Sequence, residues 1–216
     1  MTDQPLTIVY VDQAIVIVDK PSGLPTQGTR NPQQPHLYQY VLAQFPNAGL
    51  HHRLDTPSSG LVLFTVDPAA NKQIGSSFRH HAIDRRYLAV VVGDPGPQGT
   101  WSDDIDGKTA TTHFERIGHS DGMSLIEARL ETGRTHQIRI HASRAGHPIV
   151  GDRRHGGAAS RLWPRLALHA VSLSLTHPMT RETLRVCSPV PANLSGLTAA
   201  MGSDLDHRYS PEIGAD

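Results

Sequence analysis

The segment His52–Gly60 reads H-R-L-D-T-P-S-S-G and runs directly into the apolar stretch Gly60–Thr65. A polar loop that leads straight into a buried strand presents its side chains at the edge of a sheet, where active sites are common. Asp55 is the carboxylate of this loop. It can act in catalysis or can cap a turn by accepting hydrogen bonds from backbone amides, and the segment by itself favours the turn.

Two further segments carry chemistry-bearing side chains. Gly133–His141 reads G-R-T-H-Q-I-R-I-H and places two arginines near the start of a predicted helix, which by itself also fits a solvated basic helix face. Gly146–Asp152 reads G-H-P-I-V-G-D, a pattern whose Gly and Pro residues indicate a sharply turning backbone.

Together these segments resemble the signature of the RluA-type pseudouridine synthases. That pattern runs H-R-L-D-x-x-T-S-G, then K-x-Y on a strand, then G-R-T-H-Q-I-R, then G-H-P-I-x-G-D, and all four parts occur here in that order. The K-x-Y part appears as Arg85-Arg86-Tyr87. Further similar stretches, Arg165–Ala170, His177-Pro178 and Pro189–Pro191, extend the resemblance over roughly residues 6–191. The resemblance is to the stand-alone members of the family, which lack an S4 RNA-binding domain.

Three positions depart from the family pattern. Ser58 stands where Thr is usual, Arg85 replaces Lys, and His155 occupies a position that is often Tyr. The first two changes keep the hydroxyl and the charge, and the third is expected to alter contacts of its loop with RNA. None of the three touches Asp55.

The resemblance implies an isomerase that acts on uridine inside folded RNA. The reaction breaks the N-glycosidic bond, rotates the uracil and rejoins it through carbon 5, so we expect no redox cofactor and no other cofactor. The resemblance assigns Asp55 as the catalytic carboxylate, Tyr87 as the aromatic ring that stacks on the target base, and Arg139 as the cation that pairs with Asp55. A nearby arginine favours the ionised carboxylate.

The resemblance also implies residues that bind RNA. The target nucleotide must be flipped out of its stack at a cost of a few kcal/mol, and Arg53 is expected to fill the vacated space. The remaining candidates are phosphate-binding arginines and an apolar wall: Arg85, Arg134, Arg153, Arg154 and Ile138. The expected partner is a structured stem-loop of ribosomal or transfer RNA, bound by a monomer with no obligatory protein partner and no membrane.

Composition narrows the function classes. The 216 residues carry 20 basic and 20 acidic side chains, which argues against a globally basic RNA-coating protein while allowing a local basic cleft. The single Cys187 excludes an intramolecular disulfide and is expected to be a buried strand thiol. No charged-then-apolar leader and no long apolar stretch are visible, so we expect a cytoplasmic protein.

Periodicity predicts an α+β fold, built on a mixed, largely antiparallel central sheet with flanking helices. The predicted strands are Leu6–Tyr10, Ala14–Asp19, Gly60–Thr65, Arg86–Val92, Thr109–Arg116, Ser124–Leu130, Leu166–Leu175 and Thr183–Val186. The predicted helices are His36–Phe45, Asp67–His81, Thr135–Ala145 and Pro191–Met201. Residues 95–108 read as turns and Arg153–Arg165 as a mobile surface loop. We expect one catalytic domain over residues 1–201 and a disordered tail over 202–216.

Two other functions remain open. A non-catalytic RNA-binding module could keep the same fold, although such a module would not need the set Asp55, Tyr87 and Arg139. The 14 histidines could instead serve a metal-dependent hydrolase. Their spacing argues against a metal site, because His51-His52 and His80-His81 are adjacent and would point to opposite faces of a strand.

Overall fold

The structure is a computed structural model that describes residues 6–201 and 205–209. Its described residues divide into two compact units. The first contains residues 6–83 and 172–188, and the second contains 84–171, 189–201 and 205–209. The boundary falls within β9 (Leu168–Thr176).

Antiparallel strands form the framework of the first unit. β1 (Thr7–Val11) pairs with β2 (Ile15–Lys20), which pairs with β4 (Ser59–Thr65). The short β3 (Gly49–Leu50) also pairs with β4, and β10 (Thr183–Cys187) pairs with β9. Every residue of β4 is buried, which explains why its sequence is continuously apolar rather than alternating.

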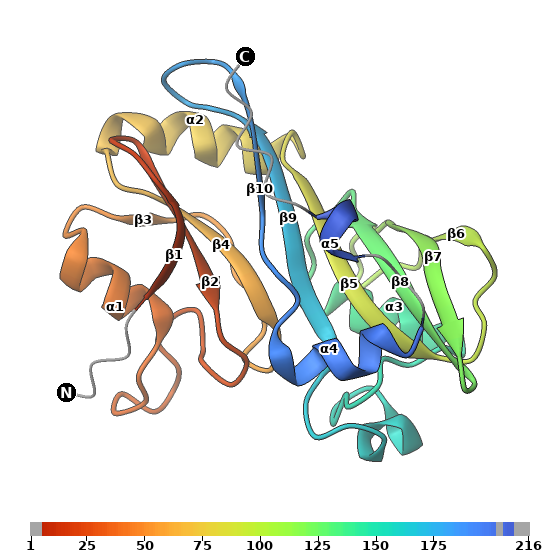
Figure 1. The fold of residues 1–216 in the computed structure, drawn as a ribbon. Helices are drawn as coiled ribbons and strands as arrows, with labels where there is room; N and C mark the ends of the chain where they lie inside the picture. The colour runs from red at the N-terminus through yellow and green to blue at the C-terminus, as the bar shows by residue number, and fades with distance from the viewer. Residues whose placement is uncertain (1–5, 202–204, 210–216) are drawn as a thin grey trace. The chain divides into compact units, whose positions relative to one another are not determined.

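Two helices labelled in Figure 1, α1 and α2, pack against β4 through side chains that point to opposite faces of the strand. Leu61 and Leu63 belong to a buried cluster that includes Ala70 and Ile74 of α2 (Pro68–Arg79). Phe64, which points to the other face because side chains alternate along a strand, stacks on Tyr38 of α1 (Leu37–Gln44). Burying each such side chain contributes about 1.5–3 kcal/mol, so the core rather than helix propensity holds these short helices.

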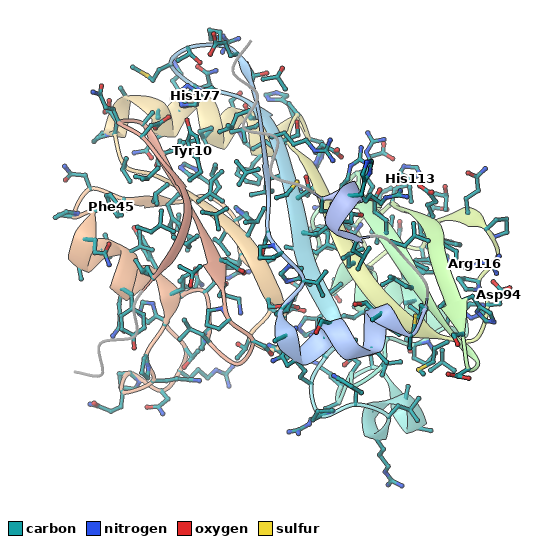
Figure 2. The ribbon with its side chains drawn as sticks, viewed as in Figure 1. Tyr10, Phe45, Asp94, His113, Arg116 and His177 are labelled. Carbon is teal, nitrogen blue, oxygen red and sulfur yellow. The ribbon has the colours of Figure 1, made fainter. Side chains whose placement is uncertain are left out.

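Polar side chains join the two hairpins of the first unit. The Tyr10 hydroxyl donates to Asp12 Oδ2, and His177 Nε2 lies 2.8 Å from the same oxygen. Figure 2 labels Tyr10 and His177. Burial, followed by the hydrogen bond to Asp12 and its charge, raises the pKa of Tyr10 to about 12. The β1–β2 turn is thereby tied to the turn that follows β9.

The second unit is built on an antiparallel meander. β5 (Asp84–Val92) pairs with β8 (Met123–Leu130), β8 with β7 (Thr112–Ser120), and β7 with β6 (Gln98–Trp101). Side chains alternate along β7, so the contacts that α3 and α5 make with this strand place the two helices on opposite faces of the sheet. His141 of α3 (Gln137–Arg144) bonds Thr112, whereas Arg208 of α5 (Leu205–Arg208) bonds Glu115 of the same strand. The remaining elements are η1 (Gly157–Arg161) and α4 (Ala192–Ala199).

The α+β class and its largely antiparallel sheet are confirmed, as are all eight predicted strands and four predicted helices. The burial of Cys187 is confirmed too. The expected tail 202–216 lies mostly outside the described residues, and within it α5 precedes the buried Tyr209. No helix in the described part of the chain is long and apolar enough to cross a membrane.

The segment 95–108, expected to be turn-rich, also contains a strand that the sequence did not predict, β6. Gly99 on this strand faces Phe114 on β7, and a Cβ there would lie 2.7 Å from the ring. Trp101 stacks on the same ring at 4.4 Å between centroids. A side chain at this position would have to displace the Phe114 ring, so the glycine serves a close aromatic contact, although in sequence it reads as a turn residue.

Candidate active site

The segment His52–Gly60 lies in the first unit, where it follows β3 and runs into the first two residues of β4. Leu54 is buried, Asp55 is half-buried and Arg53 is exposed. His52 Nε2 accepts from the backbone N–H of Leu63 and its ring stacks on Phe78. The backbone carbonyl of Asp55 accepts from the N–H of Ser58, which makes the tight turn leading into β4.

Lys20 holds this turn from inside the unit. Its side chain is fully buried at the end of β2, and its Nζ donates to the backbone carbonyls of Ser58 at 2.6 Å and Thr56 at 3.3 Å. The same ammonium donates to the carbonyls of Pro21 and Leu24. Hydrogen bonds from a charged donor are the stronger kind. The buried cation therefore fixes the backbone on the carboxyl side of Asp55.

Residues 22–26 hold the rest of the loop. The Thr26 hydroxyl donates to the carbonyl of Leu54 and accepts from its N–H, at 2.8 and 3.1 Å. Ser22 Oγ donates to the carbonyl of Pro57, and the N–H of Gly23 donates to that of Thr56. Hydrogen bonds to the backbone thus hold the residues on both sides of Asp55, so the carboxylate is carried by a segment of fixed conformation.

In the second unit, β5 carries two of the predicted side chains on one face. Tyr87 is opposite Ala128, which is opposite Phe114, and Phe114 shares a strand face with Thr112, the residue that bonds α3. Tyr87 therefore lies on the α3 face of the sheet, and Arg85, two residues earlier, lies on it too. Both are buried, with 7% and 8% of their surface exposed.

Gln137 fixes the entry to α3. Its amide oxygen accepts from the Thr132 hydroxyl and the N–H of Arg134, while its nitrogen donates to Thr111 O and Thr112 Oγ1. Gly133 passes beside Arg85, where a Cβ would lie 3.0 Å from the guanidinium. Gln137 of the segment Gly133–His141 therefore serves to bond the start of α3 to the sheet, and Gly133 leaves room for the Arg85 guanidinium.

Arg139 forms a buried ion pair with Asp152. Its Nε and Nη2 donate to the two carboxylate oxygens at 2.9 and 2.8 Å, and both side chains are at most 5% exposed. Burial raises the pKa of Asp152, but hydrogen bonds from Arg139 and from the N–H groups of His155 and Arg154 outweigh it and hold the pKa at about 2. The two-pronged contact fixes the plane of the guanidinium.

The residues after Asp152 are bonded to α3 as well. Asp152 Oδ1 accepts from the backbone N–H of Arg154 and of His155. Ser143 of α3 donates to the carbonyl of His155, and the His155 ring lies 3.0 Å from that of His136. Helix α3 and the start of the Arg153–Arg165 loop therefore form one bonded assembly.

The comparison with protein families matches residues 14–144 to the family of RNA pseudouridylate synthases. The chain belongs to that family. It is an RNA pseudouridine synthase, an isomerase, as the resemblance of its four sequence segments predicted. The match includes the segment of Asp55, the strand of Tyr87 and the helix of Arg139.

Named relatives cover nearly the whole chain. It is 34% identical to the ribosomal large subunit pseudouridine synthase D of Xanthomonas campestris, over 94% of this chain and 71% of the relative. It is 33% identical to the protein of that name from Escherichia coli K12, over 94% and 73%. The solved structure of human RNA pseudouridylate synthase domain containing 1 matches with a TM-score of 0.75 and 26% identity, over 98% of each chain.

The predicted site residues fall into both units. Asp55 and Arg53 belong to the first, and the others belong to the second; these are Arg85, Tyr87, Arg134, Ile138, Arg139, Arg153 and Arg154. The second unit brings Tyr87 and Arg139 to one face of its sheet. The pairing of Arg139 with Asp55 stays a prediction.

The candidate RNA-binding residues differ in exposure. Arg53, Arg153 and Arg154 are exposed, and Arg134 is half-buried with its Nε bonded to the carbonyl of Thr109. Ile138 is buried. Arg85 is buried as well and donates to the carbonyl of Thr132. Its burial favours a supporting role beneath Gly133 over the phosphate contact expected from sequence.

Two residues of the site were not singled out from the sequence. Lys20 ends an apolar strand and reads as an exposed terminal charge, although the following Pro-Ser-Gly turn was a signal that carbonyls would crowd around it. Asp152 was quoted only as part of a turning loop. A charged side chain next to Gly151 and 13 residues from a helical arginine gives no local signal of a buried pair.

Several histidines have structural partners in the described residues. His141 bonds Thr112 Oγ1 and the carbonyl of Asp103, and His147 bonds the carbonyl of Val92. Within residues 6–201 and 205–209, no group of three or more His, Cys, Asp or Glu is placed to hold a metal ion.

Proposed function

We propose that this protein isomerises uridine in folded ribosomal RNA, with Asp55 as the catalytic carboxylate and the target nucleotide flipped out of its stack. The substrate class is supported by the relatives, which are named ribosomal large subunit pseudouridine synthases. The observation that carries the catalytic assignment is the loop around Asp55. Five hydrogen bonds from Lys20, Ser22, Gly23 and Thr26 reach the carbonyls of Leu54, Thr56, Pro57 and Ser58, so the segment that carries the carboxylate is held in place.

Pre-positioning matters for this reaction because the flipped nucleotide has left its RNA stack, so the enzyme must hold both the nucleotide and the carboxylate that meets its sugar or base. When the reacting groups are already held in place, less entropy is lost on reaching the transition state, and the activation barrier is lower. Tyr87 is proposed to stack on the target base from the α3 face of the second unit. Arg139, whose orientation Asp152 fixes, is proposed to favour the ionised form of the catalytic carboxylate.

The RNA is proposed to bind through cations that remain accessible. Arg53 follows His52 in the loop of Asp55 and is exposed, as the role of filling the space of the flipped nucleotide requires. Arg134, Arg153 and Arg154 are proposed to contact phosphates. The protein is proposed to act as a monomer in the cytoplasm.

The first prediction tests the assignment of Asp55. Purified wild type and Asp55→Asn are incubated with unmodified, transcribed large-subunit ribosomal RNA and with transcribed transfer RNA, and pseudouridine is detected by carbodiimide labelling. Wild type should form product on ribosomal RNA, and Asp55→Asn should form none while binding the RNA with comparable affinity, because the substitution keeps the shape and removes the charge.

Asp121→Asn is the matched control, since Asp121 is an exposed carboxylate at a positive φ that Asn tolerates. It should retain activity. Product from Asp55→Asn, with deamidation excluded by mass spectrometry of the protein, overturns the assignment. Product on transfer RNA alone would change the substrate, and binding without product by wild type would favour a non-catalytic module.

A further inference from the structure

The Arg153–Arg165 loop concentrates positive charge in a chain whose formal net charge is zero. It carries four arginines and no acidic residue, whereas the whole chain has 20 basic and 20 acidic side chains. The next acidic residue along the chain is Glu182. In Figure 1 the loop is the teal segment that projects away from the strands of its own unit.

The arginines of this loop divide into one anchor and three outward side chains. Arg165 donates to Asn193 Oδ1 on α4 and to the carbonyls of Leu166 and Leu168. Arg153, Arg154 and Arg161 are exposed, and no ion pair engages them among the described residues.

Other arginines of the same unit behave differently. Arg116 pairs with Asp94, and the two are labelled together in Figure 2. Arg86 pairs with Asp84 and Glu127, and Arg208 pairs with Glu115. The unit therefore supplies carboxylates to Arg116, Arg86 and Arg208, and among the described residues it supplies none to the three outward arginines of the loop.

The base of the loop is closed and fixed. Gly151 has φ +75°, and a Cβ there would lie 1.9 Å from the carbonyl oxygen of Arg165, so the two ends of the loop touch. The N–H of Gly151 donates to the carbonyl of Ala159, and the Trp163 indole donates to that of Asn193. Contacts of this kind hold the base of the loop, which lowers the entropy that its residues lose on binding.

An apolar side chain lies beside the outward charges. Leu162 follows Arg161 directly after η1 and is 53% exposed. An exposed leucine next to a basic cluster suits a surface that meets both phosphate and the less polar sugar and base faces of RNA.

We infer that the Arg153–Arg165 loop is a preformed docking element for the phosphate backbone of the RNA that flanks the target uridine, with Arg153, Arg154 and Arg161 as phosphate contacts and Leu162 against the sugar or base surface. The inference rests on the proposed function. The loop directly follows Asp152, the residue that holds Arg139, so an RNA strand that docks on it would lie next in the chain to the ion pair of that arginine. The loop sets affinity, and the chemistry is left to other residues.

The test compares two triple variants that remove equal charge. One is Arg153→Ala/Arg154→Ala/Arg161→Ala, and the other is Arg30→Ala/Arg79→Ala/Arg185→Ala, whose arginines are exposed in the first unit. The dissociation constant for transcribed large-subunit ribosomal RNA is measured between about 50 and 200 mM salt. Single-turnover pseudouridine formation is measured at saturating protein.

The loop variant should bind about tenfold or more weakly, and the slope of log affinity against log salt should fall by about two, since each lost phosphate contact removes roughly 0.7–0.9. Its single-turnover rate at saturation should equal that of wild type. Leu162→Ser should weaken binding and leave the slope unchanged. The first-unit variant should lose less affinity than the loop variant.

Equal losses in the two triple variants, or an unchanged slope in the loop variant, overturn the docking role whether or not product forms. Absence of product from wild type, with loop-dependent binding intact, instead overturns the proposed function and leaves the docking element standing. A lower saturated rate in the loop variant would show that the loop takes part in the chemistry, contrary to the inference.

Discussion

The two segments proposed to act on the uridine are held in contrasting ways. The loop of Asp55 is held through its own backbone, by a lysine and two hydroxyls that reach its carbonyls. Arg139 is held through its side chain, by one carboxylate that meets it with two hydrogen bonds. These hydrogen bonds to the neighbouring carbonyls fix the segment that carries the proposed catalytic carboxylate without using its oxygens. A cation with five donors can use two of them for positioning.

The largest effect is expected at the buried ion pair of Arg139 with Asp152. Arg139→Ala leaves Asp152 buried without its ion-pair partner, which commonly costs about 3–5 kcal/mol. Activity should be lost together with stability, and Arg139→Lys should restore only part of it, because lysine cannot make the planar two-pronged contact. Denaturant melts of Arg139→Ala, Asp152→Ala and the double variant provide the measurement.

The double variant should be less destabilised than the sum of the single variants, since neither charge is then left alone. Strict additivity would show that the pair is not a unit. The same cycle with Asp55→Ala tests the pairing of Arg139 with the catalytic carboxylate, for which coupling in stability is the expected result.

The next effect concerns the backbone-held loop. Lys20→Met removes a buried donor from four carbonyls, and hydrogen bonds to charged groups contribute about 1.5–3 kcal/mol each, so we expect a loss of about 3 kcal/mol or more. The single-turnover rate should fall as well, under conditions where the variant is folded. Lys72→Met on the exposed side of α2 is the control and should change stability by less than about 0.5 kcal/mol. Stability of Lys20→Met close to that of the control would mean that the lysine does not hold the loop.

The sequence could predict most of the elements because their signals are local. Asp67 before Pro68 predicted the start of α2, and the structure shows Asp67 accepting from the N–H of Ala69. The strands of the first unit were predicted by continuous apolar runs. What could not be predicted depends on contacts between distant residues: Gly99 beneath Phe114, Lys20 among carbonyls, and Asp152 against Arg139. The catalytic candidates came from family resemblance, since composition and spacing alone favoured a capped turn at Asp55.

The pair in the second unit should also make stability depend on pH. The pKa of Asp152 is held at about 2, below its ordinary value of 3.8 in the unfolded chain. A depressed carboxyl pKa contributes stability that is fully present above pH 3.8 and is lost as pH falls through about 2, and here the contribution is about 2 kcal/mol. The stability difference between wild type and Asp152→Asn should therefore be largest above about pH 4 and shrink towards pH 2. A difference that stays constant over this range would count against the assigned pKa.

The smallest expected effect comes from two serines, one bonded to the loop of Asp55 and one bonded to the loop that follows Asp152. They compare the two ways of positioning most directly because their hydrogen bonds are matched. Ser22 Oγ donates to the carbonyl of Pro57, and Ser143 Oγ donates to the carbonyl of His155, both at 2.7 Å. Both serines are half-buried, so Ser22→Ala and Ser143→Ala should each cost about 1 kcal/mol. Equal losses in stability would make any difference in function informative.

That difference should follow from what each carbonyl supports. Pro57 lies two residues after Asp55, so Ser22→Ala should lower the single-turnover rate and leave RNA affinity unchanged. His155 lies at the base of the Arg153–Arg165 loop, while Asp152 still holds Arg139 with two bonds. Ser143→Ala should therefore weaken RNA binding slightly and leave the saturated rate unchanged. If both variants altered the rate alike, backbone and side-chain positioning would serve the same step, and the distinction between the two regions would fail.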